Sequence, residues 1–515
     1  MKTTTEKIEL LHKLNIEYWG RLGTLFTTDQ YKYFYDTGTG KVFQCNLAEY
    51  SVIDCLLTHS SPELLYDLPL SVDELEGAID NLIMLIEQEH IFQAPVFTDF
   101  IQPQKDEFPT IIESGIEQVI LELTEKCNLR CKYCIYHEQN DQFRNFSMND
   151  MSWDVAQKAL DYISHHVGEE LALTFYGGEP LINFKLMRKC IEYSQAIMSS
   201  TRISVSFTTN LTLLSDEIID FLTSLDKCSI LCSLDGPQHI QDFYRVTVDG
   251  RGSYDKAIEK MKKLAQAFAG KEEHSIGINA VLCPPYSLHK INEVADFFNT
   301  LEWLPEGTKV NINYVEEGSL DLQTLGLDKI ELTPEEFYGH DVIADPLAVW
   351  ANDRIDQDDD PVGIANEVGQ TRLMRIHNRV ITDTPQRGIH MNGCCFPGQR
   401  RLYVTTSGEY RVCEKMSTSP GIGDIERGLD IEAISKHYFA DYSKKSIENC
   451  SNCWAARLCG VCYAMCYQED GLNEDRKQDI CHSERATAKI YLRRYHQLLE
   501  NNPEKLQCLN EITIS

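Results

Sequence analysis

Short apolar runs alternate with amphipathic stretches through the middle of the chain. Six runs have the length and residue types of strands, and the stretches between them repeat apolar positions with helical spacing. The predicted strands lie at residues 118–123, 171–175, 203–208, 228–233, 276–282 and 310–314. The predicted helices lie at residues 154–166, 184–199, 217–225 and 254–268. This alternation indicates parallel βα units and predicts an α/β fold.

The start of the chain follows a different pattern. An aromatic run at 31–35, a Gly-rich turn and a returning run at 41–45 predict a β-hairpin. A helix is expected at 47–59, and the capping box Ser71-Val-Asp-Glu74 opens a second helix at 75–89. The order of strand, strand, helix and helix predicts a small winged-helix-like domain.

Composition narrows the class of protein. With 515 residues the chain is long enough for several domains. It has no run of about twenty apolar residues, and its start lacks the apolar core of a signal peptide, so we expect a cytoplasmic protein without a membrane span. A net charge of −31 argues against nucleic-acid binding, because phosphate contacts need clustered Lys and Arg. Cytosolic thiols stay reduced, so the 19 cysteines are better candidates for metal ligands than for disulfides.

Three cysteines carry the most specific chemistry. Cys127, Cys131 and Cys134 follow the first predicted strand with the spacing C-x3-C-x2-C. A [4Fe–4S] cluster usually takes one Cys per iron, so three ligands leave one iron open to a small molecule. The alternative is a zinc site, for which His137 could supply the fourth ligand. The spacing and the preceding strand favour the cluster.

The cysteine spacing, with the aromatic Tyr133 before the third Cys, resembles the radical S-adenosylmethionine (SAM) superfamily. The resemblance implies that the open iron binds SAM, and that other residues at strand ends complete the cofactor pocket. The run Tyr176-Gly-Gly-Glu-Pro180 follows the second predicted strand and matches the family's stretch that holds the SAM amino group. Asp235 lies in an Asp-Gly-Pro turn and has an ordinary structural explanation. The cofactor-binding residues expected from the resemblance are Tyr133, Gly177, Gly178, Glu179, Pro180, Asn210, Ser233 and Arg245.

A second set of cysteines lies near the end of the chain. It comprises Cys394, Cys395, Cys413, Cys450, Cys453, Cys459, Cys462, Cys466 and Cys481. Their order resembles the SPASM domain, which holds two auxiliary [4Fe–4S] clusters. The resemblance implies a distal cluster on Cys450, Cys453, Cys459 and Cys481. It implies a nearer cluster on Cys413, one of Cys394 and Cys395, and Cys462 or Cys466.

This second set departs from the family pattern. The step Cys459-x2-Cys462 is one residue shorter than in many members, which makes Cys466 an extra cysteine. The Cys394-Cys395 doublet also leaves one ligand of the nearer cluster undecided. It is therefore open whether that cluster is fully coordinated or keeps a free iron. A structural zinc-binding domain is the alternative.

These features predict a partial (β/α)6 barrel between two smaller domains. The expected boundaries are 1–95 for the winged-helix-like domain, 96–116 for a linker, 117–320 for the barrel, 321–390 for a connecting region, 391–490 for the SPASM domain and 491–515 for a tail. The N-terminal domain resembles the recognition element that binds the leader of a precursor peptide as an added strand. A plain dimerisation or packing module is the alternative.

Together the three parts resemble maturases of ribosomally synthesised peptides. The resemblance implies cleavage of SAM to a 5′-deoxyadenosyl radical, hydrogen abstraction from a Cys-containing precursor, and closure of a thioether. An electron donor such as ferredoxin or flavodoxin is implied, and no residue is assigned as a general acid or base. Carbon–carbon crosslinking, or oxidation of a Ser or Cys as in sulfatase maturation, is the enzymatic alternative. The non-enzymatic alternative is a zinc-binding scaffold, whose purified protein would be colourless rather than brown.

Overall fold

The computed structural model describes residues 4–14, 16–113, 115–136, 144–315, 319, 346–357, 363–391, 393–416 and 418–510. Much of the predicted connecting region at 321–390 lies outside these ranges, as does His137. Within the described ranges no helix is both long and apolar enough to cross a membrane.

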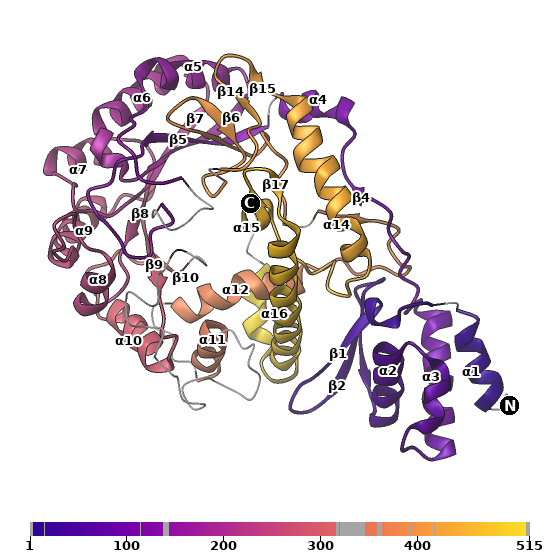
Figure 1. Ribbon diagram of the computed structural model, residues 1–515. Coiled ribbons are helices and arrows are strands. Elements are labelled where there is room, and N and C mark those ends of the chain that lie inside the picture. The colour runs from indigo at the N-terminus through magenta and orange to yellow at the C-terminus, as the bar shows by residue number, and fades with distance from the viewer. Residues whose placement is uncertain are drawn as a thin grey trace.

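The N-terminal unit is a three-stranded antiparallel sheet covered by helices (Figure 1). The predicted capping box is present, because Ser71 accepts from the Glu74 amide and Glu74 accepts from the Ser71 amide. The first helix, α1, and the first strand, β1, were not predicted from the sequence. The unit consists of α1 (Thr4–His12), β1 (Gly23–Thr27), β2 (Lys32–Asp36), β3 (Val42–Cys45), α2 (Leu47–His59) and α3 (Val72–Gln88).

Both faces of this small sheet are buried. Leu25 and Phe34 point to one side and pack with the apolar faces of α2 and α3. Phe26 and Tyr35 point to the other side and share a core with residues of α12 (Ile364–His377) and α16 (Glu474–Asn501). The alternating side-chain directions of a strand produce this double burial. The N-terminal unit is therefore docked on the C-terminal helices rather than loosely attached.

A ten-stranded mixed sheet forms the centre of the molecule, in the order β10-β9-β8-β7-β6-β5-β12-β13-β14-β15. Strands β5 to β10 are parallel and curve within a ring of helices (Figure 1). The parallel strands are β5 (Ile116–Thr124), β6 (Val167–Gly177), β7 (Arg202–Thr209), β8 (Cys228–Ser233), β9 (His274–Leu282) and β10 (Lys309–Tyr314). The helices are α5 (Trp153–Ser164), α6 (Phe184–Ile197), α7 (Asp216–Thr223), α8 (Gln238–Tyr244), α9 (Tyr254–Phe268) and α10 (Leu288–Asn299). The predicted α/β class is confirmed.

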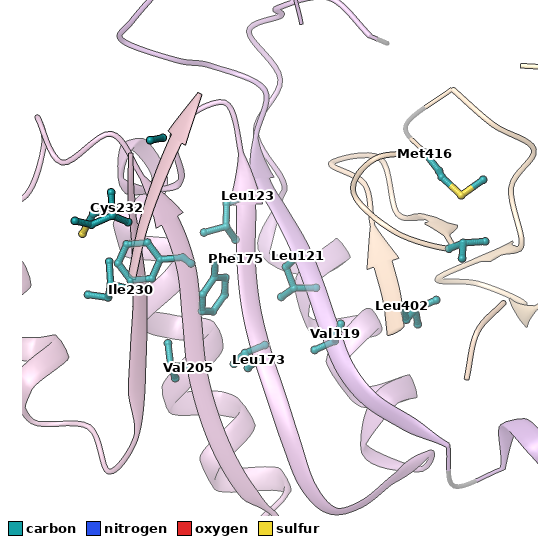
Figure 2. Packing of buried hydrophobic residues seen from close by; sticks show 14 of the residues in the cluster. Val119, Leu121, Leu123, Leu173, Phe175, Val205, Ile230, Cys232, Leu402 and Met416 are labelled. Atoms are coloured by element: carbon teal, nitrogen blue, oxygen red, sulfur yellow. The ribbon is translucent and has the colours of Figure 1, made fainter. Parts of the chain in front are cut away.

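The two faces of the parallel strands differ in chemistry. Val119, Leu121 and Phe175 belong to the main apolar core, as Figure 2 shows. Residues with the opposite parity face the inside of the curved sheet, and Gln118, Thr174 and Ser206 form a polar ladder there. There the Gln118 amide donates to Thr174 Oγ1 at 2.8 Å, and Thr174 Oγ1 is 2.8 Å from Ser206 Oγ. The inner face can therefore accept polar groups.

The C-terminal part continues the same sheet. Strand β12 (Arg401–Val404) pairs with β5 in parallel, from Arg401 opposite Gln118 to Val404 opposite Leu121. The sheet then extends through β13 (Glu409–Arg411), β14 (Gly423–Asp424) and β15 (Gly428–Leu429). The remaining elements are α11 (Pro346–Asp356), α13 (Ile431–Ala433), a π-helix (Ile434–Ala440), α14 (Asp441–Ser451), α15 (Tyr463–Cys466), β16 (Tyr467–Gln468) and β17 (Gly471–Leu472).

Two segments differ from the sequence analysis. The segment predicted as a linker contains β4 (Phe100–Ile101) and α4 (Phe108–Ile112), and β4 pairs with β11 (Ile389–His390). Its Phe97, Phe100 and Phe108 are buried in the main core, which fastens it to the C-terminal part. Helix α16 runs through the expected boundary at residue 490, because its buried face continues unbroken to Leu498.

Candidate functional site

The first cysteine loop leaves the carboxyl end of β5. Cys127, Cys131 and Cys134 are partly exposed and lie close enough to one another to interact electrostatically. Burial raises the pKa of Cys127 and of Cys131 to about 12, whereas Arg130 favours the thiolate at Cys127 and Arg245 at Cys131. The loop thus gathers three soft donors with positive charge beside them.

This donor set suits iron–sulfur chemistry, because thiolates are the usual protein ligands of [4Fe–4S] clusters. Within the part of the chain that the structure describes, no three Cys, His, Asp or Glu side chains are grouped as the ligands of one metal ion would be. The end of the loop is tied to β5, where Arg144 Nε donates to Glu122 Oε1 at 2.7 Å and the guanidinium stacks on Tyr136.

The Gly-Gly-Glu-Pro run closes directly on the cysteine loop. A Cβ at Gly177, whose φ is +145°, would lie 2.2 Å from the Thr124 carbonyl oxygen. At Gly178 it would lie 2.1 Å from the Lys126 carbonyl oxygen. The Gly178 and Glu179 amides donate to these two carbonyls at 2.9 Å. The glycines therefore let the two loops meet backbone to backbone, in addition to any approach to a ligand.

Glu179 joins neighbouring strand ends. Its carboxylate accepts from Thr209 Oγ1 and from the Asn210 amide, both at 2.8 Å. Burial raises the pKa of Glu179 to about 7, and these hydrogen bonds act against the rise. Asn210 Nδ2 donates onward to Asn128 in the cysteine loop at 3.0 Å. The predicted residues Gly178, Glu179 and Asn210 thus form one continuous edge beside Cys127.

Asp235 organises the other side of the site. Its carboxylate accepts from Tyr133 at 2.6 Å, from Arg245 Nε at 3.0 Å and from the Val281 amide at 3.0 Å. Asp235 and Arg245 are both buried, and so is Ser233 at the end of β8. The structure therefore brings Tyr133 and Arg245 together through Asp235. It also assigns Asp235 a larger part than an ordinary turn residue has.

We expect Ser233→Ala and Arg245→Lys to weaken SAM binding about ten- to a hundredfold, since a hydrogen bond to a charged group contributes roughly 1.5–3 kcal/mol. We choose lysine and not alanine as the substitution for Arg245, because an uncharged side chain would leave the buried Asp235 carboxylate without a positive partner. Equilibrium titration measures the affinity, and iron content should stay unchanged. Ser229→Ala is the matched control on the same strand, where Ser229 bonds Ser275 away from the site. Unchanged affinity in both site variants would place the pocket elsewhere.

We divide the second cysteine set into two groups by position, although Cys394 also interacts with Cys459, and Cys466 with Cys481. The distal cysteine group, Cys450, Cys453, Cys459 and Cys481, lines a pocket of about 770 Å³. Cys450 interacts electrostatically with Cys453 and Cys481, and Cys459 interacts with Cys450 and Cys481. These are the four cysteines that the resemblance assigns to a distal cluster. The pocket is also lined by Tyr18 and Gly20 of the N-terminal unit.

The near cysteine group consists of Cys394, Cys413, Cys462 and Cys466. Cys394 interacts electrostatically with Cys462 and Cys466, and Cys413 interacts with Cys462. The doublet is split, because Cys394 is partly buried among these thiols whereas Cys395 is exposed and interacts with Cys462. Burial raises the pKa of the Cys413 thiol to about 12.

The first cysteine loop and the hairpin that leads to Cys413 are joined through the central sheet. The Thr406 amide, just after β12, donates to Glu122 at 3.3 Å, and its hydroxyl donates to Glu125 at 2.6 Å. Glu122 also holds Arg144 at the end of the first cysteine loop. The hairpin that leads to Cys413 is therefore anchored to the strand that leads to Cys127.

Comparison with known proteins identifies the central part. Residues 121–298 match the Radical SAM superfamily. The chain contains a radical SAM domain. This makes it an enzyme whose cofactors are a [4Fe–4S] cluster and SAM, and the three thiols of the first loop fit that cluster.

Individual relatives extend the likeness beyond the radical SAM domain. The chain is 24% identical over 409 residues to the radical SAM cyclopropyl synthase TigE of Paramaledivibacter caminithermalis, covering 76% of this chain and 75% of TigE. It is 29% identical over 157 residues to the serine-type anaerobic sulfatase-maturating enzyme of Bacteroides thetaiotaomicron, covering 30% of this chain and 36% of that protein. An uncharacterized protein of Methanocaldococcus jannaschii is 32% identical over 139 residues, which cover 27% of this chain. The chain thus spans less than half the length of the last two relatives, 45% in the archaeal case.

The fold likeness covers more of the molecule. The structure of anSMEcpe with bound AdoMet and a peptide has a TM-score of 0.51 and 18% sequence identity. The match covers 77% of this chain and 100% of that one. At this identity the likeness concerns the fold alone.

Proposed function

We propose that this enzyme is a maturase that installs thioether crosslinks in a Cys-containing, ribosomally synthesised precursor peptide. One observation carries the proposal: a second set of thiols, four of which line one pocket, is anchored through β12 to the strand that bears the first cysteine loop. We infer that the two groups hold auxiliary [4Fe–4S] clusters in a SPASM domain, and that the parallel strands form a partial barrel.

Different residues of the chain would bind SAM and hold the auxiliary clusters. When bound, the cluster and SAM supply a carbon-centred radical that removes a hydrogen atom from the peptide. Arg245 and Ser233 would hold the cofactor's polar groups, and Glu179 would orient its amino group. The near cysteine group would hold a cluster, and that cluster would supply an iron site for the substrate sulfur or an acceptor for the remaining electron. A metal-held thiolate has already lost its proton, so the arrangement requires no separate general base.

The N-terminal unit would hold the leader of the precursor peptide. Strand β3 pairs only with β2 in the described sheet, so one of its edges is free to receive another strand. The same unit lies against the loop between Cys453 and Cys459 of the distal cysteine group. There Thr37 Oγ1 donates to the Trp454 carbonyl at 2.9 Å. A leader on β3 would therefore be held beside the C-terminal domain, with an electron donor such as ferredoxin or flavodoxin supplying the reducing equivalents.

A single backbone change tests the leader site. The Asp36 amide donates to the Lys41 carbonyl, so by antiparallel alternation the backbone groups of Val42 and Gln44 point to the free edge. Gln44→Pro should weaken leader binding at least about tenfold, because it removes one outward N–H donor. Fluorescence anisotropy with a labelled leader measures the affinity.

Gln44→Ala is the matched control, since it removes the exposed side chain and keeps the N–H. SAM cleavage without peptide should be the same in both variants. Equal leader affinity in the proline and alanine variants would identify the hairpin as a packing module. Deleting residues 1–95 is a poorer test, because it would expose the core that Tyr35 shares with Tyr491 and Leu458.

Carbon–carbon bond formation is the second candidate. The observation that favours it is the match to TigE, a cyclopropyl synthase by name, over 409 residues. Oxidation of a Ser or Cys, the reaction class of the sulfatase-maturating relatives, is a third outcome. Anaerobic reaction with a small Cys-rich peptide encoded beside the gene, followed by mass spectrometry and thiol alkylation, separates the three.

A further inference from the structure

Lys477 is a buried lysine between the two cysteine groups of the C-terminal domain. It lies in the first turn of α16, and it is only 5% exposed. Its Nζ donates to Cys450 Sγ at 3.5 Å and also interacts electrostatically with Cys481 and Cys466. Cys450 and Cys481 belong to the distal group, and Cys466 belongs to the near group. The ammonium therefore faces thiols of both groups.

The position of the Lys477 ammonium is electrostatically unfavourable when no negative group lies nearby. A positive charge in the first turn of a helix opposes the helix dipole, and burying an ammonium carries a large desolvation penalty. Thiolates nearby would offset both costs.

Tyr442 completes the partition between the groups. It is 4% exposed, lines the distal pocket, and its ring centroid lies 5.4 Å from Lys477 Nζ. It interacts electrostatically with Cys394 of the near group and with Cys450 of the distal group. Its ring packs edge-on against Tyr463 and tilted against Phe100, which fixes its orientation. Lys477 thus lies against a buried aromatic ring.

We propose that Lys477 is a positioning residue that raises the reduction potential of the distal auxiliary cluster by donating a charged hydrogen bond to Cys450. This inference rests on the proposed auxiliary clusters. Reduction adds negative charge to a cluster, and a cation at this distance stabilises the more negative state. Hydrogen bonds to ligand sulfurs shift cluster potentials in the same direction. The distal cluster would therefore accept the electron left after crosslinking more readily than it would without Lys477.

The test isolates the auxiliary clusters. The full chain carrying Cys127→Ala, Cys131→Ala and Cys134→Ala lacks ligands for the first cluster, so its iron reports on the second set alone. Lys477→Met, which removes the charge and keeps the length, is compared with Lys477→Arg in this background. Lys445→Met is the matched control, because Lys445 lines the same pocket and donates to the Leu472 carbonyl. Redox titration followed by electron paramagnetic resonance gives the midpoint potentials.

We expect Lys477→Met to make the distal cluster about tenfold harder to reduce, which is about 59 mV more negative for one electron. Lys477→Arg and Lys445→Met should stay near the parent. Intact iron with no larger shift in Lys477→Met than in Lys445→Met would overturn the inference and leave the proposed function standing. Absence of iron and sulfide from the parent background would overturn both. If Lys477→Met loses iron, retention in Lys477→Arg supports the role of the charge, and loss in both overturns it.

Discussion

Replacing Cys127, Cys131 and Cys134 together by Ala should abolish reductive cleavage of SAM. The change removes every thiol that the loop after β5 offers to the cluster. About two-thirds of the iron should remain if two auxiliary clusters are present, because each cube has its own cysteines. Anaerobic product analysis by chromatography measures cleavage, and iron and sulfide determination measures cluster content.

A matched variant separates loss of ligands from loss of folding. Cys190, Cys228 and Cys232 are also three cysteines of the radical SAM domain, but they are buried in its apolar core. Replacing these by Ala should preserve SAM cleavage and all of the iron, at a modest cost in stability from lost packing. Cleavage at the parent rate in the variant of Cys127, Cys131 and Cys134 would contradict the assignment of the cluster to this loop.

The sequence predicted the central strands because their two faces are chemically distinct. Val119, Leu121 and Phe175 lie in the apolar core, whereas Gln118 and Thr174 bond each other on the inner face. Apolar and polar residues therefore alternate within a few positions along each strand, and this pattern predicts a strand without knowledge of its tertiary partners. The predicted strand at 228–233 matches β8, and the predicted helix at 254–268 matches α9.

Elements that depend on distant partners could not be predicted in the same way. Strand β12 is four residues long and is completed by pairing with β5, almost three hundred positions earlier. Helix α16 begins with a polar, highly charged run, and its buried face is defined by the N-terminal sheet and by α12. The segment with Phe97 and Phe108 lacks periodicity because its aromatic side chains fill gaps in a core formed by other elements.

The candidate site shows the same division. Motif spacing indicated the first cysteine loop, the Gly-Gly-Glu-Pro run and the later cysteines. It did not indicate that Asp235 would hold Tyr133, Arg245 and the Val281 amide at once. Nor did it single out Lys477, a single lysine in a charged helix start. Two sequence features could have indicated these residues: the Asp-Gly-Pro turn at a strand end for Asp235, and the spacing of four residues before Cys481 for Lys477. Neither is specific, because Asp is common in exposed turns and Lys is common on exposed helices.

Replacing Cys413 or Cys481 by Ala should stop modification of the peptide while SAM cleavage survives. Cys413 lies in the near cysteine group and Cys481 in the distal one, whereas the radical is generated at the first loop. Uncoupled formation of 5′-deoxyadenosine should therefore continue in both variants. Cys190→Ala, a buried thiol on α6 far from both groups in the sequence, is the control and should modify the peptide normally.

The product of the parent enzyme decides which bond is formed. A thioether replaces one S–H and one C–H by a single S–C bond. Each crosslink therefore removes two hydrogens, about 2 Da, and consumes one thiol. The reacting sulfur is a thiolate, whose deprotonation is favoured by binding to a metal. Alkylation before and after reaction should then show one alkylatable Cys fewer for each loss of this mass. The same mass loss with every thiol still alkylatable would favour a carbon–carbon bond and exclude the thioether. Modified peptide from the Cys413→Ala or Cys481→Ala variant at the parent level would show that the corresponding cysteine group does not take part in closing the crosslink.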